Sequence, residues 1–318
     1  MSNKRDILVI LGNGFDLAYG LKSSYKDFYE SDFWPFKPKN IGTTKIRSVS
    51  ELDRYLNRMM PTSEHWYDLE SLLAKYASDI TDVSAERAKE DLECFKELKK
   101  GLLEFISHAQ GSVRKPTPMN PAVRAIWALH EFRVPKIYTF NYTDLSALAS
   151  LGGVQGVVCY HVHGALEKRN IVIGIEDNIK VPKEYDFLKK VSEPTYRSSN
   201  LYYDLNNAKE VVFFGHSLGE NDYHFFRHFF QIHSDEANSD TKHKCGITIF
   251  TANVKSRMDL LGNLRAMNDG RNNQLFAQND LRFIRTKDDD TNSQLEFDEW
   301  IKFLENTKDK FKMNINPW

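Results

Sequence analysis

Short apolar runs alternate along the chain with longer segments in which apolar residues recur at helical spacing. The first run, residues 7–11, ends at Gly12-Asn13-Gly14. A continuous apolar run closed by glycines is typical of a buried strand in a parallel sheet. Further runs that predict strands lie at residues 136–140, 157–162, 171–175, 210–214, 246–251 and 281–285. Most are separated by segments long enough for a helix, which favours an α/β fold with helices on both faces of a parallel sheet.

A long helical block separates the first predicted strand from the second. One face of its main helix carries apolar residues three or four positions apart: Leu92, Phe95, Leu98, Leu102 and Phe105. Charged residues fill the other face, which is typical of a helix packed on a core. We therefore predict a Rossmann-like domain formed by residues 1–30 and 121–318, with residues 31–120 inserted as a helical subdomain.

Capping signals mark the starts of two further helices. Ser24-x-x-Asp27 is a capping box and predicts a helix that begins near Tyr25. Ser293-x-x-Glu296 predicts the start of the last, amphipathic helix.

Composition excludes several classes of protein. The net charge is −1 and the charges are mixed in sign, so no basic footprint for nucleic acid is present. No apolar run approaches the roughly 18 residues that span a bilayer. The first strand begins almost at the N-terminus without a signal peptide, and we expect a cytoplasmic protein that does not bind membranes. The isolated cysteines Cys94, Cys159 and Cys245 argue against a disulfide framework and a cysteine zinc site, so no metal is expected.

Polar clusters follow four of the predicted strands, and three of these clusters contain glycine. They lie at residues 12–16, 141–144, 161–164 and 215–222. Ligands of open α/β sheets bind outside the carboxyl ends of the strands. Four such clusters therefore predict one crevice lined by their side chains.

The first cluster resembles part of a dinucleotide cradle. Gly12 and Gly14 allow a sharp turn and a close backbone approach, and a helix starting there would face phosphate with its N–H groups. The complete fingerprint has a third glycine where this chain has Leu17, so an ordinary tight turn stays an alternative. Asp16 suits ribose hydroxyls, or caps the helix.

Histidines offer two further candidate sites. His161 and His163 alternate along a strand and cannot face the same side, and His163, next to Gly164, is the better candidate for the crevice. His224 and His228 have the spacing of a zinc pair, but phenylalanines surround them. That pattern favours an aromatic core-facing helix.

Gly215-His216-Ser217-Leu218-Gly219 spells the nucleophile elbow of a serine hydrolase. Such an enzyme also needs an acid and then a histidine downstream, and the last histidine is His243, only 26 residues after Ser217. A serine hydrolase using Ser217 is therefore an alternative with an incomplete triad.

The order of these motifs resembles the NAD site of the sirtuin-like superfamily. The matching segments are Gly12-Asn13-Gly14-Phe15-Asp16 with Asp27-Phe28, Thr139-Phe140-Asn141, His163-Gly164 and Gly215-His216-Ser217. More closely, the glycine loop, Phe140-Asn141-Tyr142-Thr143-Asp144, His163-Gly164 and Gly215-His216-Ser217-Leu218 with Asp222 resemble the phage abortive-infection family AbiH.

Three features of this chain differ from the sirtuin pattern and bear on which sirtuin-like activity the resemblance implies. The four-cysteine zinc module is missing, Phe140 replaces the glutamine of Thr-Gln-Asn, and Asp16 replaces the serine of the glycine loop. Protein deacylation is therefore not expected. The resemblance implies the branch that hydrolyses NAD itself in antiphage defence, with NAD as substrate.

The resemblance also implies a role for each residue of the crevice. Two residues are expected to be catalytic: Asn141, which holds the nicotinamide ribose or the attacking water, and His163, the general base. The pyrophosphate is expected at Gly12, Asn13 and Gly14. Ribose hydroxyls are expected at Asp16, Ser217 and Asp222. The nicotinamide side is expected to be shaped by Phe15, Phe28 and Tyr142. Asp144, Gly215 and His216 are also expected to bind the nucleotide.

Other functions and partners stay open at this point. The same crevice could belong to a non-catalytic nucleotide sensor in phage defence, which would leave its ligand intact. The candidate partners are a dinucleotide, a second copy of the chain and a phage-derived trigger or partner protein.

Overall fold

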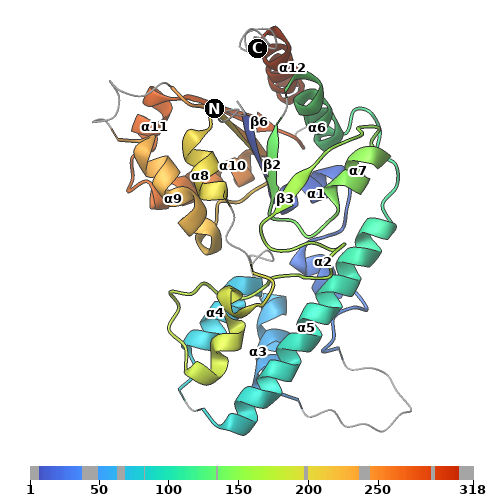
Figure 1. Ribbon diagram of the computed structural model, residues 1–318, viewed down its shortest axis with the longest axis vertical. Coiled ribbons are helices and arrows are strands. Elements are labelled where there is room, and N and C mark those ends of the chain that lie inside the picture. Colours follow the sequence, from blue (N-terminus) through green and yellow to red (C-terminus); the bar gives the residue numbers. More distant parts are fainter. Residues whose placement is uncertain are drawn as a thin grey trace, which may run out of the picture. The chain divides into compact units, whose positions relative to one another are not determined.

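The computed structural model describes residues 7–37, 49–62, 69–81, 83–133, 135–196, 200–235, 244–287 and 291–307. The chain divides into two compact units (Figure 1). The first comprises the described parts of Met1–Leu21, Arg114–Val162 and Ser198–Trp318. The second comprises those of Lys22–Val113 and His163–Arg197.

The first unit is built on a six-stranded sheet in which every neighbouring pair is parallel. Its strands are β1 (Ile7–Leu11), β2 (Lys136–Thr139), β3 (Cys159–His161), β4 (Glu210–Phe214), β5 (Gly246–Thr251) and β6 (Asp280–Arg285). Their order is β3-β2-β1-β4-β5-β6. The α/β class and the Rossmann-like parallel sheet predicted from the apolar runs are thus confirmed.

Helices cover both faces of this sheet (Figure 1). They are α1 (Asn13–Tyr19), α6 (Pro121–Phe132), α7 (Leu145–Leu151), α8 (Leu201–Asn207), α9 (Tyr223–Ile232), α10 (Val254–Met267), α11 (Asn272–Gln278) and α12 (Thr291–Asn306). A short 3₁₀ turn, Glu220–Asp222, precedes α9. Because both faces are covered, all five residues of β1 and of β4 are buried.

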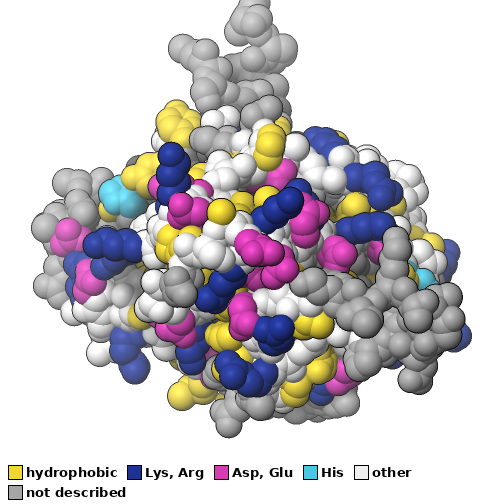
Figure 2. Space-filling model, turned by 90° about the horizontal axis from the view of Figure 1, so that it is seen from below, with side chains coloured by type: hydrophobic (Ala, Val, Ile, Leu, Met, Phe, Trp, Pro, Cys, Tyr) yellow, Lys and Arg dark blue, Asp and Glu magenta, His cyan; other side chains and the backbone are white. Residues whose placement is uncertain are grey.

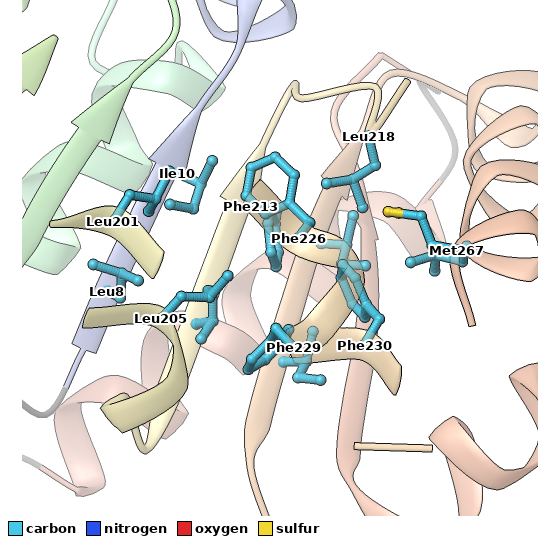
Figure 3. Packing of buried hydrophobic residues seen from close by; sticks show 14 of the residues in the cluster. Leu8, Ile10, Leu201, Leu205, Phe213, Leu218, Phe226, Phe229, Phe230 and Met267 are labelled. Atoms are coloured by element: carbon cyan, nitrogen blue, oxygen red, sulfur yellow. The ribbon is translucent and has the colours of Figure 1, made fainter. Parts of the chain in front are cut away.

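Alternate residues of each strand point to opposite faces and fill two cores. On one face, Leu8 and Ile10 of β1 and Phe213 of β4 pack with the helices α8, α9 and α10, as Figure 3 shows. On the other face, Phe214 meets Phe15 of α1. The same face holds the contacts of Phe250 with α12.

The second unit is mostly helical. Its elements are α2 (Tyr25–Glu30), α3 (Glu51–Met59), α4 (Leu69–Ser78), α5 (Ala85–Gly111) and the 3₁₀ turns Met60–Thr62, Lys183–Leu188 and Lys190–Ser192. The capping box at α2 is confirmed, since the Ser24 hydroxyl accepts the Asp27 N–H and the Asp27 carboxylate accepts the Ser24 N–H. The last helix differs from its predicted start, because α12 already begins at Thr291 and Ser293 lies inside it.

Buried polar groups tie the second unit together. The fully buried Asp91 of α5 accepts hydrogen bonds from the Leu52 N–H and from the hydroxyls of Tyr76 and Tyr185. These donors come from α3, α4 and the 3₁₀ turn at 183–188, so one carboxylate joins four segments.

One apolar run does not form the strand that the sequence predicts. Residues 171–175 are not part of the sheet; Ile175 makes only an isolated bridge with Lys189. The prediction of a strand is wrong because these apolar side chains are buried within the second unit. The segment 163–197 belongs to that unit, whereas the sequence reading assigned it to the sheet domain.

The described surface carries charges of both signs. In the view of Figure 2, lysine, arginine and acidic side chains are interspersed. Of the helices described, none combines the length and the apolar composition needed to cross a membrane.

Candidate functional site

The candidate site lies at the carboxyl edge of the sheet in the first unit. The strand order reverses direction between β1 and β4, because β2 and β3 add to one side of β1 and β4 to β6 add to the other. Such a switch point is where open α/β sheets bind ligands. The loops after β1, β2 and β4 therefore meet where a ligand is expected.

The two glycines after β1 permit a close approach to the loop after β4. A Cβ on Gly12 would lie 2.6 Å from the His216 Cα, and one on Gly14 would lie 2.6 Å from the Gly215 Cα. The N–H of Gly12 donates to Phe214 O at 3.0 Å and that of Gly14 to Gly215 O at 2.9 Å. The glycines thus have a packing role, and a pyrophosphate held at this turn would rely on other groups.

Asp16 and Asn141 form the buried centre of the site. Asp16 is 2% exposed, and its Oδ1 accepts a 2.7 Å hydrogen bond from Asn141 Nδ2. Its Oδ2 accepts the Thr143 hydroxyl at 2.9 Å, and Asn141 Nδ2 also donates to Gly12 O at 3.1 Å. Burial raises the pKa of Asp16 from 3.8 to about 7, although the hydrogen bonds from Thr143 and Asn141 act in the opposite direction.

His161 holds the main chain of Asn141. Its Nδ1 lies 3.0 Å from Asn141 O, and because a carbonyl oxygen can only accept, Nδ1 carries the proton. The Asn141 N–H donates to Thr139 Oγ1 at 3.1 Å, and His161 Nε2 lies 3.6 Å from Cys159 Sγ. The sequence favoured His163 because it lies next to Gly164 at the strand's end, and it gave no signal for the contact between His161 and the main chain of Asn141.

His163 and Phe28 belong to the second unit. His163 is 6% exposed, and its carbonyl oxygen accepts the Val172 N–H at 2.8 Å. Phe28 is fully buried between Trp34 and Phe105, so its ring is part of that unit's core. The roles proposed for these two residues stay predictions.

The aromatic residues of the first unit that were expected beside nicotinamide are buried. Phe15 is 1% exposed and packs edge-on against Phe214 with ring centroids 5.4 Å apart. Tyr142 is 9% exposed and directly follows Asn141. Phe15 therefore packs α1 against the sheet.

The loop after β4 is organised by His216. Its Nδ1 accepts the Leu218 N–H at 3.0 Å, and its Nε2 lies 3.5 Å from Asp222 Oδ2. The imidazole is 5% exposed and packs against the ring of Phe140, 4.4 Å away between centroids. This ring fixes the loop on which Ser217 is exposed.

The nucleophile-elbow interpretation finds no support in this loop. The left-handed backbone falls on Gly215 and Leu218, with φ of 65° and 52°, and not on Ser217. Among the described residues, Ser217 has no hydrogen bond to a histidine, and the nearby His216 imidazole is engaged by Leu218 and Asp222.

Asp144, which the sequence predicted to bind the nucleotide, caps α7: its Oδ1 accepts a 2.9 Å hydrogen bond from the Ala147 N–H.

The sequence model of the family described as Bacteriophage abortive infection AbiH matches residues 8–241. The chain belongs to the AbiH family. The match covers the full set of predicted site residues, from Gly12 to Asp222. Membership assigns the protein to phage abortive infection. A search of curated proteins gave no match.

The two spaced histidines of this AbiH chain lie on α9. Its buried face is formed by Phe226, Phe229 and Phe230, while His228 is exposed and stacks on Tyr202. No group of three potential metal-binding side chains gathers within the part of the chain that is described. The aromatic core face predicted for this helix is confirmed.

A cavity of about 370 Å³ lies at the opposite, amino edge of the AbiH sheet. Its lining consists of residues at or before the starts of β4, β5 and β6, together with Phe303 of α12: Lys209, Glu210, Lys244, Gly246, Asn279, Asp280 and Phe303. The predicted site residues do not line it.

Proposed function

We propose that this AbiH protein acts in abortive infection by binding NAD and hydrolysing it to nicotinamide and ADP-ribose. The observation that carries the proposal is the placement of Asn141 at the switch point of a Rossmann-ordered sheet, fixed there by Asp16. The resemblance of the four strand-end motifs to a sirtuin-like NAD site supports the choice of nucleotide.

Polar groups around Asn141 suit a dinucleotide. Asn13, at the start of α1, and Ser217, in the loop after β4, are exposed, and Asp222 is half-buried. These side chains offer acceptors and donors for ribose hydroxyls and phosphate. Gly12 and Gly14 keep the loops close without adding side chains.

Hydrolysis breaks the bond between ribose C1′ and the nicotinamide nitrogen. The bonding electron pair leaves with nicotinamide, whose ring becomes neutral, and C1′ acquires oxocarbenium character. Water then adds to C1′ and loses a proton. Both hydrogens of the Asn141 amide nitrogen are donated within the protein, so its side-chain oxygen is the group that can accept from a ribose hydroxyl or the water.

The test is nicotinamide release from NAD by the purified protein, followed by chromatography. Asn141→Ala should lower release by about 100-fold or more, because it removes the group that orients the reactants. Asn206→Ala, which removes an exposed amide hydrogen-bonded to Tyr202 O of its own helix, should leave release unchanged. His163→Ala tests the proposed general base, for which a loss of about 10²–10⁴-fold is expected.

Calorimetry with NAD completes the test if no nicotinamide appears. If the wild type binds NAD but releases no nicotinamide, the proposal of hydrolysis is replaced by that of a nucleotide sensor. Neither release nor binding would overturn the proposal altogether.

A further inference from the structure

We infer that Asp16 and His161 are positioning residues that fix Asn141, and that Asp16 makes no contact with the nucleotide. The inference rests on the proposed function for the role of Asn141. It replaces the expectation that Asp16 holds ribose hydroxyls.

The carboxyl group of Asp16 is occupied by the protein. One oxygen accepts from Asn141 at 2.7 Å and the other from Thr143 at 2.9 Å. Only 2% of the residue is exposed, so a ribose hydroxyl has no open approach to either oxygen. A buried carboxyl with this geometry organises its neighbours.

Asp16 determines which way the Asn141 amide points. Of the two amide hydrogens, one is directed at Asp16 and the other at Gly12 O, 3.1 Å away. Turning the amide by 180° would set its oxygen against Gly12 O, which can only accept, and would remove the N–H that Asp16 Oδ1 now accepts. The observed orientation leaves the Asn141 side-chain oxygen, rather than its nitrogen, available to a reactant.

His161 fixes the main chain of the same residue. Its Nδ1–H donates to Asn141 O at 3.0 Å, while Thr139 Oγ1 accepts the Asn141 N–H at 3.1 Å. The two bonds tie the loop after β2 to β3 and to the end of β2. The side chain of Asn141 is thus held by Asp16 of α1 and by Gly12 O, and its main chain by residues of β2 and β3.

The kinetics of Asp16→Asn distinguish positioning of Asn141 from a structural role and from ribose binding. If Asp16 only stabilised the fold, Asp16→Asn would change the amount of folded protein and leave kcat per folded molecule unchanged. If Asp16 held ribose, the substitution would raise KM. Positioning predicts a loss in kcat with little change in KM, because the group affected acts through Asn141.

The kinetic experiment compares Asp16→Asn with the wild type and with Asp91→Asn. Asp91 is likewise a buried carboxyl bonded to hydroxyl groups, but it lies in the second unit and controls for the loss of a buried charge. We expect kcat for Asp16→Asn to fall at least about tenfold, because one of its two acceptors becomes a donor. KM should stay within about twofold. An unchanged kcat, or a raised KM alone, would overturn the inference.

Two substitutions test His161, one that removes its hydrogen-bond donor and one that replaces it. His161→Leu removes the donor to Asn141 O and should lower kcat. His161→Asn can place an amide N–H near the position of Nδ1 and should recover at least part of the loss. Equal activity of the two variants would contradict a role for this hydrogen bond.

The orientation of Asn141 can also be measured without turnover, by NMR of protein labelled with ¹⁵N-asparagine. The Asn141 side-chain signals are identified by their loss in Asn141→Gln. In the wild type these amide protons should exchange slowly with water, and in Asp16→Asn they should shift and exchange at least about tenfold faster. Fast exchange in the wild type would overturn the positioning itself. Missing nicotinamide release with slow exchange would instead count against the proposed function.

Discussion

Asp16 combines nearly complete burial with a carboxyl group, and this combination is costly unless the group is hydrogen-bonded or neutral. Two donors reach it, and burial still raises its pKa to about 7. The folded protein therefore binds a proton at Asp16 more tightly than the unfolded chain does. Between about pH 4 and pH 7, the free energy of unfolding contributed by this group must fall as the pH rises.

Asp16→Asn should remove this pH dependence. The raised pKa corresponds to roughly 4 kcal/mol between the acidic and the neutral range, as an upper bound for one buried group. The stability of the variant relative to the wild type should therefore increase from pH 5 to pH 8. Denaturant unfolding of both proteins at several pH values measures it. Parallel stability curves would show that Asp16 is not the titrating group.

Gly14 has to be a glycine because the loop after β4 packs directly against it, which the Gly-x-Gly motif alone does not show. Gly14→Ala would place a methyl group 2.6 Å from the Gly215 Cα, so backbone has to move, at an expected cost of about 1–3 kcal/mol. Gly262→Ala is the matched control, because nothing lies within 4 Å of its Cβ position in α10. It should stabilise by about 0.5–1 kcal/mol. Equal effects of both substitutions on the unfolding midpoint would refute the close approach.

The sequence predicted which polar residues follow the strands, but not which of them form hydrogen bonds with one another. Asn141 and Asp16 could each be placed at the end of a strand. Their hydrogen bond joins residues 125 positions apart, and no local pattern specifies which of several polar groups will meet. The same holds for His161, since alternation shows only that His161 and His163 face opposite sides.

At the scale of elements, an ion cluster holds one segment of the second unit. Lys190 is 3% exposed, and its Nζ lies 2.9 Å from Glu70 of α4 and 3.0 Å from Glu176. An ammonium group between two carboxylates offsets their mutual repulsion. The segment 163–197 is thereby bound to the helices of its unit.

Lys190→Met should destabilise the protein by about 3 kcal/mol, because two partly buried carboxylates lose their counter-charge. Lys100→Met breaks an exposed pair with Glu104 on α5 and should cost less than about 0.5 kcal/mol. Chemical denaturation of the two variants measures the difference. A loss as small at Lys190 as at Lys100 would show that the buried cluster contributes no stability.

A helix or strand could be predicted from the sequence where its local pattern is compatible with only one structure. The continuous apolar runs of β1 and β4 are buried on both faces, as such runs in parallel sheets are. The run at 171–175 is similarly apolar but is buried in the second unit instead of the sheet. A local pattern reports that a segment is buried and does not report in which core.

At the scale of the whole molecule, the chain passes between two units more than once. The sequence indicated one helical insertion, at 31–120, whereas the second unit combines Lys22–Val113 with His163–Arg197. AbiH membership covers the residues from β1 to beyond α9 and assigns the protein to phage abortive infection. We propose NAD hydrolysis as the step by which this protein stops an infected cell.

The most direct measurement of this claim is the NAD content of phage-infected bacteria that carry the wild-type protein or Asn141→Ala, at matched protein levels. We expect NAD to fall after infection only with the wild type, with nicotinamide and ADP-ribose appearing, and protection to be lost with the variant. Protection by the wild type at an unchanged NAD level would contradict NAD hydrolysis as the function of this site.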